Sequence, residues 1–161
     1  MRKYFLTIVI VFYFNSQSML NANAADMVFK GVLVEPPPCK INEGIDMTLS
    51  FDKIGVNKVD GDNYRKEIEY TLSCKDSPSR NLTMMLDTSS VASFSSGTIQ
   101  SNIAGLGIKI YINGAPAEFS KPLVIKQGEK PKLEAVPVSQ PGIDLTEGKF
   151  YASATLTFKF Q

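Results

Sequence analysis

The feature that most constrains the fold is the alternation of side chains in the final stretch, GKFYASATLTFKFQ, which covers residues 148–161. Every second position from Phe150 to Phe160 is apolar, and the positions between carry Lys, Tyr, Ser or Thr. A period of two predicts a strand with one face on a core and the other in water. Such a strand needs neighbours along both edges, because its main-chain groups point to both sides. The sequence stops one residue after the last apolar side chain, so we expect one neighbour to come from elsewhere.

The first 24 residues have the composition of a secretory signal peptide. Arg2 and Lys3 form a basic start, residues 4–14 are almost all apolar, and Ala22-Asn23-Ala24 is an A-x-A cleavage site. A membrane anchor is the alternative interpretation, but the apolar run is shorter than the roughly 20 residues that span a bilayer. We expect cleavage after Ala24 and export of residues 25–161 without membrane insertion.

The exported chain would carry almost no net charge. Removing residues 1–24 takes away two of the 17 Lys and Arg residues and none of the 16 acidic residues, which leaves a net charge of −1. This balance gives no electrostatic basis for binding nucleic acid or an anionic membrane.

In an oxidising compartment, Cys39 and Cys74 are expected to form one disulfide. Metal or redox chemistry at these sulfurs is the weaker interpretation, because the chain has no His and the spacing is far from CxxC.

Short apolar runs separated by turn signals predict the rest of the fold. Strands are expected at 47–51, 68–74, 82–86, 108–112, 123–125, 133–138 and 150–160. Turn sequences such as Asn113-Gly114 lie between them. The stretch 87–107, rich in Ser and Gly, is expected to be a long connection with room for a short helix. Seven or so short strands with polar connections predict one all-β sandwich domain.

The segment that follows the predicted cleavage site is a second strand-like run. In ADMVFKGVLVEPPPCKI, one register holds Met27, Phe29, Gly31 and Leu33, and the other holds Val28, Lys30, Val32 and Val34. The run could be the first strand of the sandwich. Pro36-Pro37-Pro38 instead favours a separate arm over residues 25–35, because three prolines impose extended geometry and remove three donors. The register with Lys30 outside avoids burying an unpaired charge.

The surplus arm and the final strand without a neighbour complement each other. If each molecule gives its arm to the next, the contact is heterologous and builds a fibre. An arm this apolar would otherwise be an aggregation hazard.

These residues resemble the subunits of chaperone–usher pili, the fimbrial pilins of Gram-negative bacteria. The resemblance covers the whole exported chain and rests on FKGVLV before a cysteine, a second cysteine ending an alternating strand, and the closing pattern from Gly148 to the penultimate Phe160. Many pilins have Tyr at that penultimate position. The arm is most similar to those of minor tip-fibrillum pilins of the P-pilus kind.

The resemblance implies an incomplete immunoglobulin-like β-sandwich that lacks its seventh strand. It also implies a donor-strand extension at 25–35, a pilin domain at 36–161, and no cofactor. A periplasmic chaperone would fill the groove during transport, and at an outer-membrane usher the arm of a neighbouring subunit would replace the chaperone. The resulting structural subunit would support cell adhesion from a surface fimbrium. The arm residues facing the groove would be Met27, Phe29, Gly31 and Leu33. The chaperone and groove strand would comprise Gly148, Phe150, Ala152, Ala154, Leu156, Phe158, Phe160 and the carboxylate of Gln161.

Three other functions are compatible with parts of the sequence. An enzyme is disfavoured, because without His no Ser/His/Asp or Cys/His arrangement exists, and Asp60 with Asp62 or Glu67 with Glu69 fit polar turns and solvated strand faces better. A receptor-binding fimbrial subunit and a self-complemented, exported immunoglobulin-like module are the remaining alternatives. The oligomeric state of the purified protein separates the last from a fibre subunit.

Overall fold

A computed structural model of the 161-residue chain describes residues 30–32, 39–74, 81–126 and 128–160. The chain divides into two units, Met1–Val34 and Glu35–Gln161. In the first unit, the described residues Lys30, Gly31 and Val32 belong to no strand, and Val32 is 87% exposed. The predicted cleavage site and the other proposed arm residues, Met27, Phe29 and Leu33, lie outside the described residues.

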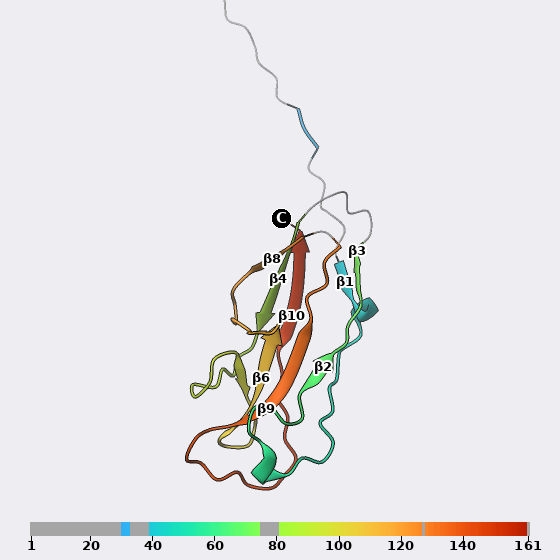
Figure 1. Cartoon of the computed structure of the whole chain (residues 1–161). Helices are drawn as coiled ribbons and strands as arrows, with labels where there is room; N and C mark the ends of the chain where they lie inside the picture. Colours follow the sequence, from blue (N-terminus) through green and yellow to red (C-terminus); the bar gives the residue numbers. More distant parts are fainter. Residues whose placement is uncertain (1–29, 33–38, 75–80, 127, 161) are drawn as a thin grey trace, which may run out of the picture. The chain divides into compact units, whose positions relative to one another are not determined.

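The second unit is built from antiparallel strands (Figure 1). In chain order the elements are β1 (Cys39–Ile41), η1 (Asn42–Gly44), η2 (Val56–Lys58), β2 (Lys66–Ile68), β3 (Leu72–Cys74), β4 (Leu82–Asp87), β5 (Thr98–Gln100), β6 (Leu106–Ile112), β7 (Ala115–Pro116), β8 (Leu123–Ile125), β9 (Leu133–Ser139) and β10 (Thr155–Phe160). One sheet has the order β2-β9-β6-β5, with β7 beside β6. A second has the order β10-β4-β8, and β1 pairs with β3. The all-β prediction is confirmed.

Alternating side chains place the core between the sheets. In β4, Leu82, Met84 and Leu86 are buried, and the residues between them are only partly buried. One cluster fills the end of the domain near the C-terminus and comprises Tyr70, Leu82, Met84, Ile125, Leu133 and Phe158. A second cluster lies toward the other end and comprises Leu86, Ile99, Ile108, Ile110, Ala117 and Ala135.

The predicted disulfide joins Cys39 of β1 to Cys74 of β3, which are directly opposed in the β1–β3 pair. The two residues are 35 positions apart. A cross-link closing a loop of this length stabilises a fold by about 4 kcal/mol in the chain-entropy model. The bond fixes the start of the domain against the strand that ends at Cys74.

Four sequence expectations about local structure differ from the observed fold. The expected strand at 150–160 begins only at Thr155, and 47–51 forms no strand. The run at 68–74 is divided into β2 and β3. The 87–107 stretch contains β5 and no described helix, because Thr98–Gln100 pairs with β6. In each case, the presence or absence of a pairing partner decides whether an extended segment becomes a strand.

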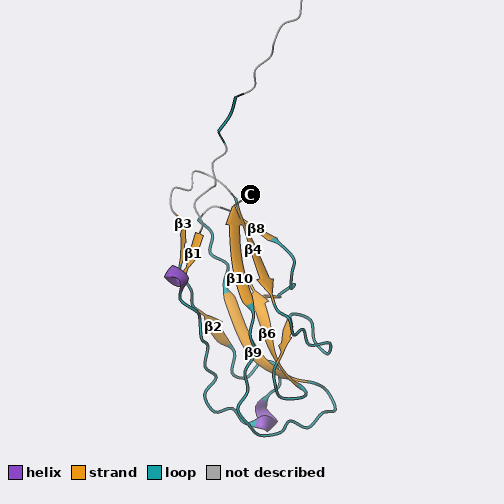
Figure 2. Cartoon of the chain, turned by 180° about the vertical axis from the view of Figure 1, so that it is seen from behind, coloured by secondary structure: helices purple, strands orange, loops and turns teal. Residues whose placement is uncertain are grey.

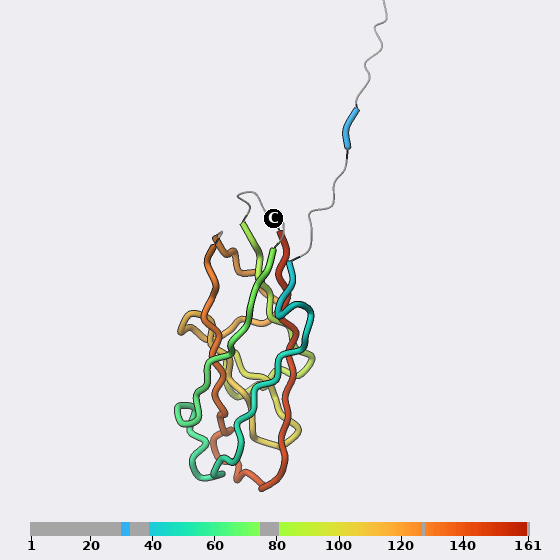
Figure 3. Tube along the Cα trace, turned by 90° about the vertical axis from the view of Figure 1, so that its right-hand side faces the viewer, coloured from blue at the N-terminus to red at the C-terminus, as the bar shows by residue number. Residues whose placement is uncertain are grey.

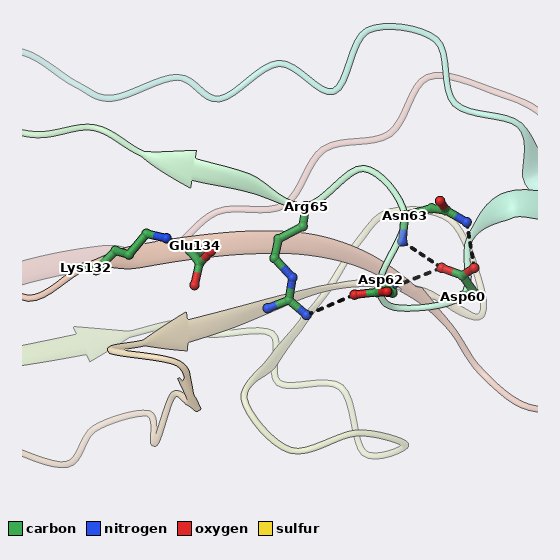
Figure 4. A network of polar contacts seen from close by, with 6 residues as sticks. All are labelled: Asp60, Asp62, Asn63, Arg65, Lys132 and Glu134. Carbon is green, nitrogen blue, oxygen red and sulfur yellow. Dashed lines mark hydrogen bonds and ion pairs between the residues drawn. The ribbon is translucent and has the colours of Figure 1, made fainter.

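Asp60 organises the turn that leads into β2 (Figure 4). Its Oδ1 accepts hydrogen bonds from the main-chain N–H groups of Asn63 at 2.8 Å and Asp62 at 3.0 Å. These donors hold the pKa of Asp60 below its ordinary value of 3.8. Arg65 then pairs with Asp62 at 3.6 Å and lies 4.3 Å from the centre of the Tyr111 ring. Asp60 and Asp62 therefore serve the turn, as the sequence suggested.

Gly107 marks a close approach between β6 and β5. A Cβ at this position would collide with Thr98 Cγ2 and lie 3.1 Å from the Ile99 carbonyl oxygen. We predict that Gly107→Ala lowers the free energy of unfolding by about 1–3 kcal/mol, because Thr98 is fully buried and cannot move aside. Gly55→Ala is the matched control, since its nearest neighbour would be 3.6 Å away. Urea denaturation of both variants checks the prediction, and equal stability would contradict it.

Tyr70 gives the core a pH dependence at alkaline pH. Its side chain is 3% exposed and its hydroxyl donates to the Pro131 carbonyl at 2.7 Å. Burial raises the pKa of Tyr70 from 10.0 to about 12. The folded state therefore holds the phenol proton more tightly than the unfolded state does. The contribution of protonated Tyr70 to stability is complete below pH 10 and is lost as the pH rises toward 12.

We predict that Tyr70→Phe costs about 1 kcal/mol at neutral pH, because the Pro131 carbonyl loses its donor. The variant should then lose less stability than the wild type between neutral pH and the alkaline range. Urea unfolding at neutral pH and in the alkaline range measures this loss of stability for each protein. Tyr151→Phe is the control, because Tyr151 is 75% exposed. Parallel losses in wild type and Tyr70→Phe would contradict the assignment.

Candidate functional site: a groove along the final strand

A groove of about 1740 Å³ opens along the second unit between two extended segments. One wall is formed by residues 46–59 and the other by residues 145–152 with Ala154 and Leu156. Both segments run lengthwise along the domain in Figure 3, and Figure 2 draws 46–54 and 145–154 as loops. The floor comprises Leu86, Ile99, Ile108, Ile110 and Ala135 of the second core cluster, together with Leu133 of the first.

The C-terminal wall carries most of the side chains that the sequence assigned to the groove strand. Gly148, Phe150, Ala152, Ala154 and Leu156 all line the groove.

The remaining groove-strand residues lie elsewhere. Phe158 is 8% exposed and belongs to the first core cluster, and Phe160 packs against that cluster. Gln161 lies outside the described residues. The alternating face is therefore continuous, but only its N-terminal part lines open space.

The opposite wall was missed as part of the site. Met47, Leu49 and Phe51 line the groove from the N-terminal segment, and Met47 is 37% exposed. The sequence predicts only a strand at 47–51, and that pattern does not distinguish a groove wall from an ordinary core strand. The two walls meet where the rings of Phe51 and Phe150 lie 6.1 Å apart between centroids.

The N-terminal wall is tied to β2 by Lys66. Its ammonium donates to the Ser50 carbonyl at 2.7 Å and to Asp52 Oδ2 at 3.1 Å. The hydrogen bond from Lys66 holds the pKa of Asp52 below its ordinary value of 3.8. These two contacts connect residues 50 and 52 of the wall to β2.

The main chain of the C-terminal wall is bonded on one edge only. Tyr151 donates to Asn102 Oδ1 at 2.7 Å, and the Ser153 carbonyl accepts from Thr88 Oγ1 at 2.9 Å. Alternate residues of an extended segment point their N–H and C=O groups to the same edge. The main-chain N–H and C=O groups at positions 150, 152 and 154 therefore point toward the other edge of the segment.

Within the described part of the chain, no hydrogen bond joins the main chain at positions 150, 152 or 154 to another residue. The residues that follow form β10, which pairs with β4 along one edge. Among the described strands, none pairs with the other edge of β10. The groove thus combines an apolar floor with an unpaired strand edge.

The described residues contain no group of three or more His, Cys, Asp or Glu side chains arranged to hold a metal ion. Among these same residues, no helix is both long and apolar enough to cross a membrane. Besides its apolar side chains and main-chain groups, the groove lining includes charged side chains, among them Asp46, Lys53, Glu67, Glu147 and Lys149.

These features define an all-β sandwich domain with an open groove, apolar at its floor, beside an unpaired strand edge. The model of the family described as "Fimbrial protein" matches residues 27–161, and the chain belongs to this family of pilus structural subunits. The family is structural and not enzymatic, and its members form surface fimbriae.

Two relatives from Escherichia coli (strain K12) support the family assignment. The chain is 33% identical over 167 residues to the uncharacterized fimbrial-like protein YfcQ, with both chains fully covered. It is 31% identical over 150 residues to the uncharacterized fimbrial-like protein YfcR, covering 89% of this chain and 85% of the relative.

Solved pilus structures share the fold. The P pilus adaptor subunit PapF matches with a TM-score of 0.58 and 22% identity, covering 79% of this chain and 98% of PapF. The P pilus rod subunit PapA matches with a TM-score of 0.61 and 19% identity, covering 84% and 100% respectively. The resemblance to chaperone–usher pilins and the immunoglobulin-like pilin fold are thereby confirmed.

Proposed function

We propose that this pilus subunit polymerises by donor-strand exchange, with its groove receiving an extended strand from another protein. A periplasmic chaperone would supply the strand first, and at an outer-membrane usher the arm of a neighbouring subunit would replace it. The observation that carries the proposal is the unpaired main chain at 150, 152 and 154 beside an apolar floor. Adding a strand to an exposed sheet edge is an established mode of peptide recognition, in which main-chain bonds give affinity and side-chain pockets give specificity.

The arm at 25–35 fits such a groove in its chemistry. Met27, Phe29 and Leu33 would face the floor, and burying each would contribute about 1.5–3 kcal/mol. Gly31 between them would permit close approach of the two main chains. Lys30 would remain in water. The terminal carboxylate of Gln161 would bind basic groups of the chaperone.

A neighbouring molecule is favoured over the chain's own arm as donor. Only Pro36, Pro37 and Pro38 separate the arm from Cys39, at which β1 begins. To enter its own groove, the chain would have to reverse at these three residues, which prefer extended geometry. A second candidate role in receptor binding is not favoured by any described feature, so adhesion would be supported through the fibre.

Gly31→Arg tests both the exchange and the arm register. The arginine would meet the acceptor floor, so we expect loss of incorporation into fibres while the chaperone complex still forms. Val32→Arg is the matched control, because in this register residue 32 faces water. Electron microscopy of surface fibres and co-purification with the chaperone are the measurements. Normal fibres containing Gly31→Arg would refute the proposed register, and purification of the wild type only as a self-complemented monomer would refute the exchange.

The acceptor side is tested by adjacent substitutions in the groove wall. Ala152→Glu would place a carboxylate against the apolar floor, so binding of a synthetic peptide spanning residues 25–35 should weaken by roughly 100-fold. Ser153→Glu points away from the groove and should bind nearly as the wild type does. Fluorescence anisotropy with labelled peptide measures both affinities. Equal weakening by the two variants would contradict the alternation of the wall.

A further inference from the structure

Besides the bond from Thr88 to Ser153, one loop residue holds the outer edge of the C-terminal wall of the groove. Asn102 makes three hydrogen bonds to it. Its main-chain N–H donates to the Tyr151 carbonyl at 3.3 Å, its Oδ1 accepts from the Tyr151 N–H at 2.7 Å, and its Nδ2 donates to the Lys149 carbonyl at 3.1 Å. The first two bonds reproduce the pair that an antiparallel strand would make with Tyr151.

We propose that Asn102 is a positioning residue for strand capture: it stands in for a strand along the outer edge of residues 149–153 and keeps the empty groove ready for its partner. This inference rests on the proposed function, because it assigns a role in binding the donor strand. No strand pairs with residues 149–153 in the described chain, whereas β4 supports the following residues in β10.

The loop that presents Asn102 is itself fixed. Gln100 Nε2 donates to the carbonyls of Ser101, Ile103 and Leu106 at 3.0–3.1 Å. Ser101 is 8% exposed, and its Oγ donates to the Leu106 carbonyl at 2.8 Å. A loop with this many internal bonds can hold a neighbouring segment at low entropic cost.

The same loop also contacts the groove. Ile103 lines it, and a Cβ built on Gly148 would lie 3.8 Å from Ile103 Cδ1. The wall is therefore bonded at its outer edge by Asn102, and the next residue, Ile103, lies close to the start of the wall at Gly148. Because a preformed edge needs no ordering at the moment of encounter, Asn102 should speed capture of the incoming strand.

The test uses the full chain purified as a monomer and a fluorescent peptide spanning residues 25–35. Asn102→Ala removes both side-chain bonds and should slow peptide association about tenfold, with a smaller change in dissociation. Asn102→Asp keeps the acceptor for the Tyr151 N–H and loses the donor to the Lys149 carbonyl. Its association rate should therefore lie between the rates of the wild type and of Asn102→Ala. Asn63→Ala is the control, because Asn63 also bonds through its side chain but lies outside the groove lining.

Unchanged association by Asn102→Ala, with the wild type binding, would overturn this inference and leave the proposed function intact. Failure of the wild type to bind would overturn both. Amide hydrogen exchange on the wild type gives a test that requires no variant to fold. Without peptide, the Tyr151 amide should exchange more slowly than those of Phe150 and Ala152, and equally fast exchange at all three would also overturn the inference.

Discussion

The structure depends on an unmet requirement for main-chain hydrogen bonding along the groove wall at residues 150–154. A sandwich normally meets this requirement within its own sheets, because unpaired groups next to an apolar core are costly. Here the floor and both walls come from one chain, and the strand between the walls does not occur among the described residues. The unpaired main-chain groups beside the apolar floor therefore raise the free energy of the domain, and an added strand would lower it by pairing with them.

The domain tolerates this deficit because its other half is complete. Near the C-terminus, Phe158 stacks with Tyr70 at 6.1 Å between ring centroids, and β10 pairs with β4 along its full length. The Cys39–Cys74 bond closes the neighbouring β1–β3 pair. The closed half, the disulfide and the Lys66 contacts to the N-terminal wall connect the elements around the open half.

The sequence predicted the face of the final strand better than its extent. Alternation is a property of side chains, so it identified Phe150, Ala152 and Phe158 as one inward face. Whether a segment counts as a strand depends on a partner, which is why the expected strand at 150–160 begins only at Thr155. The Cys39–Cys74 bond was predictable because only two cysteines exist.

Other parts of the site left no readable pattern. Asn102 bonds residues that are 47 and 49 positions away along the chain, and Lys66 bonds residues that are 16 and 14 positions away. Neither residue belongs to a periodic motif. The stretch 87–107 looked like a polar connection, although Thr98 and Ile99 are buried. Its strand β5 exists because β6 lies beside it, and that proximity is a tertiary property.

An open edge is also a hazard, since it can pair with any exposed strand. The side chains at the groove determine which strands can use it. In the proposed exchange, the apolar floor would require apolar residues at alternate positions of the incoming strand. A strand with the wrong register would place polar groups on the floor and lose more by desolvation than its main-chain bonds return.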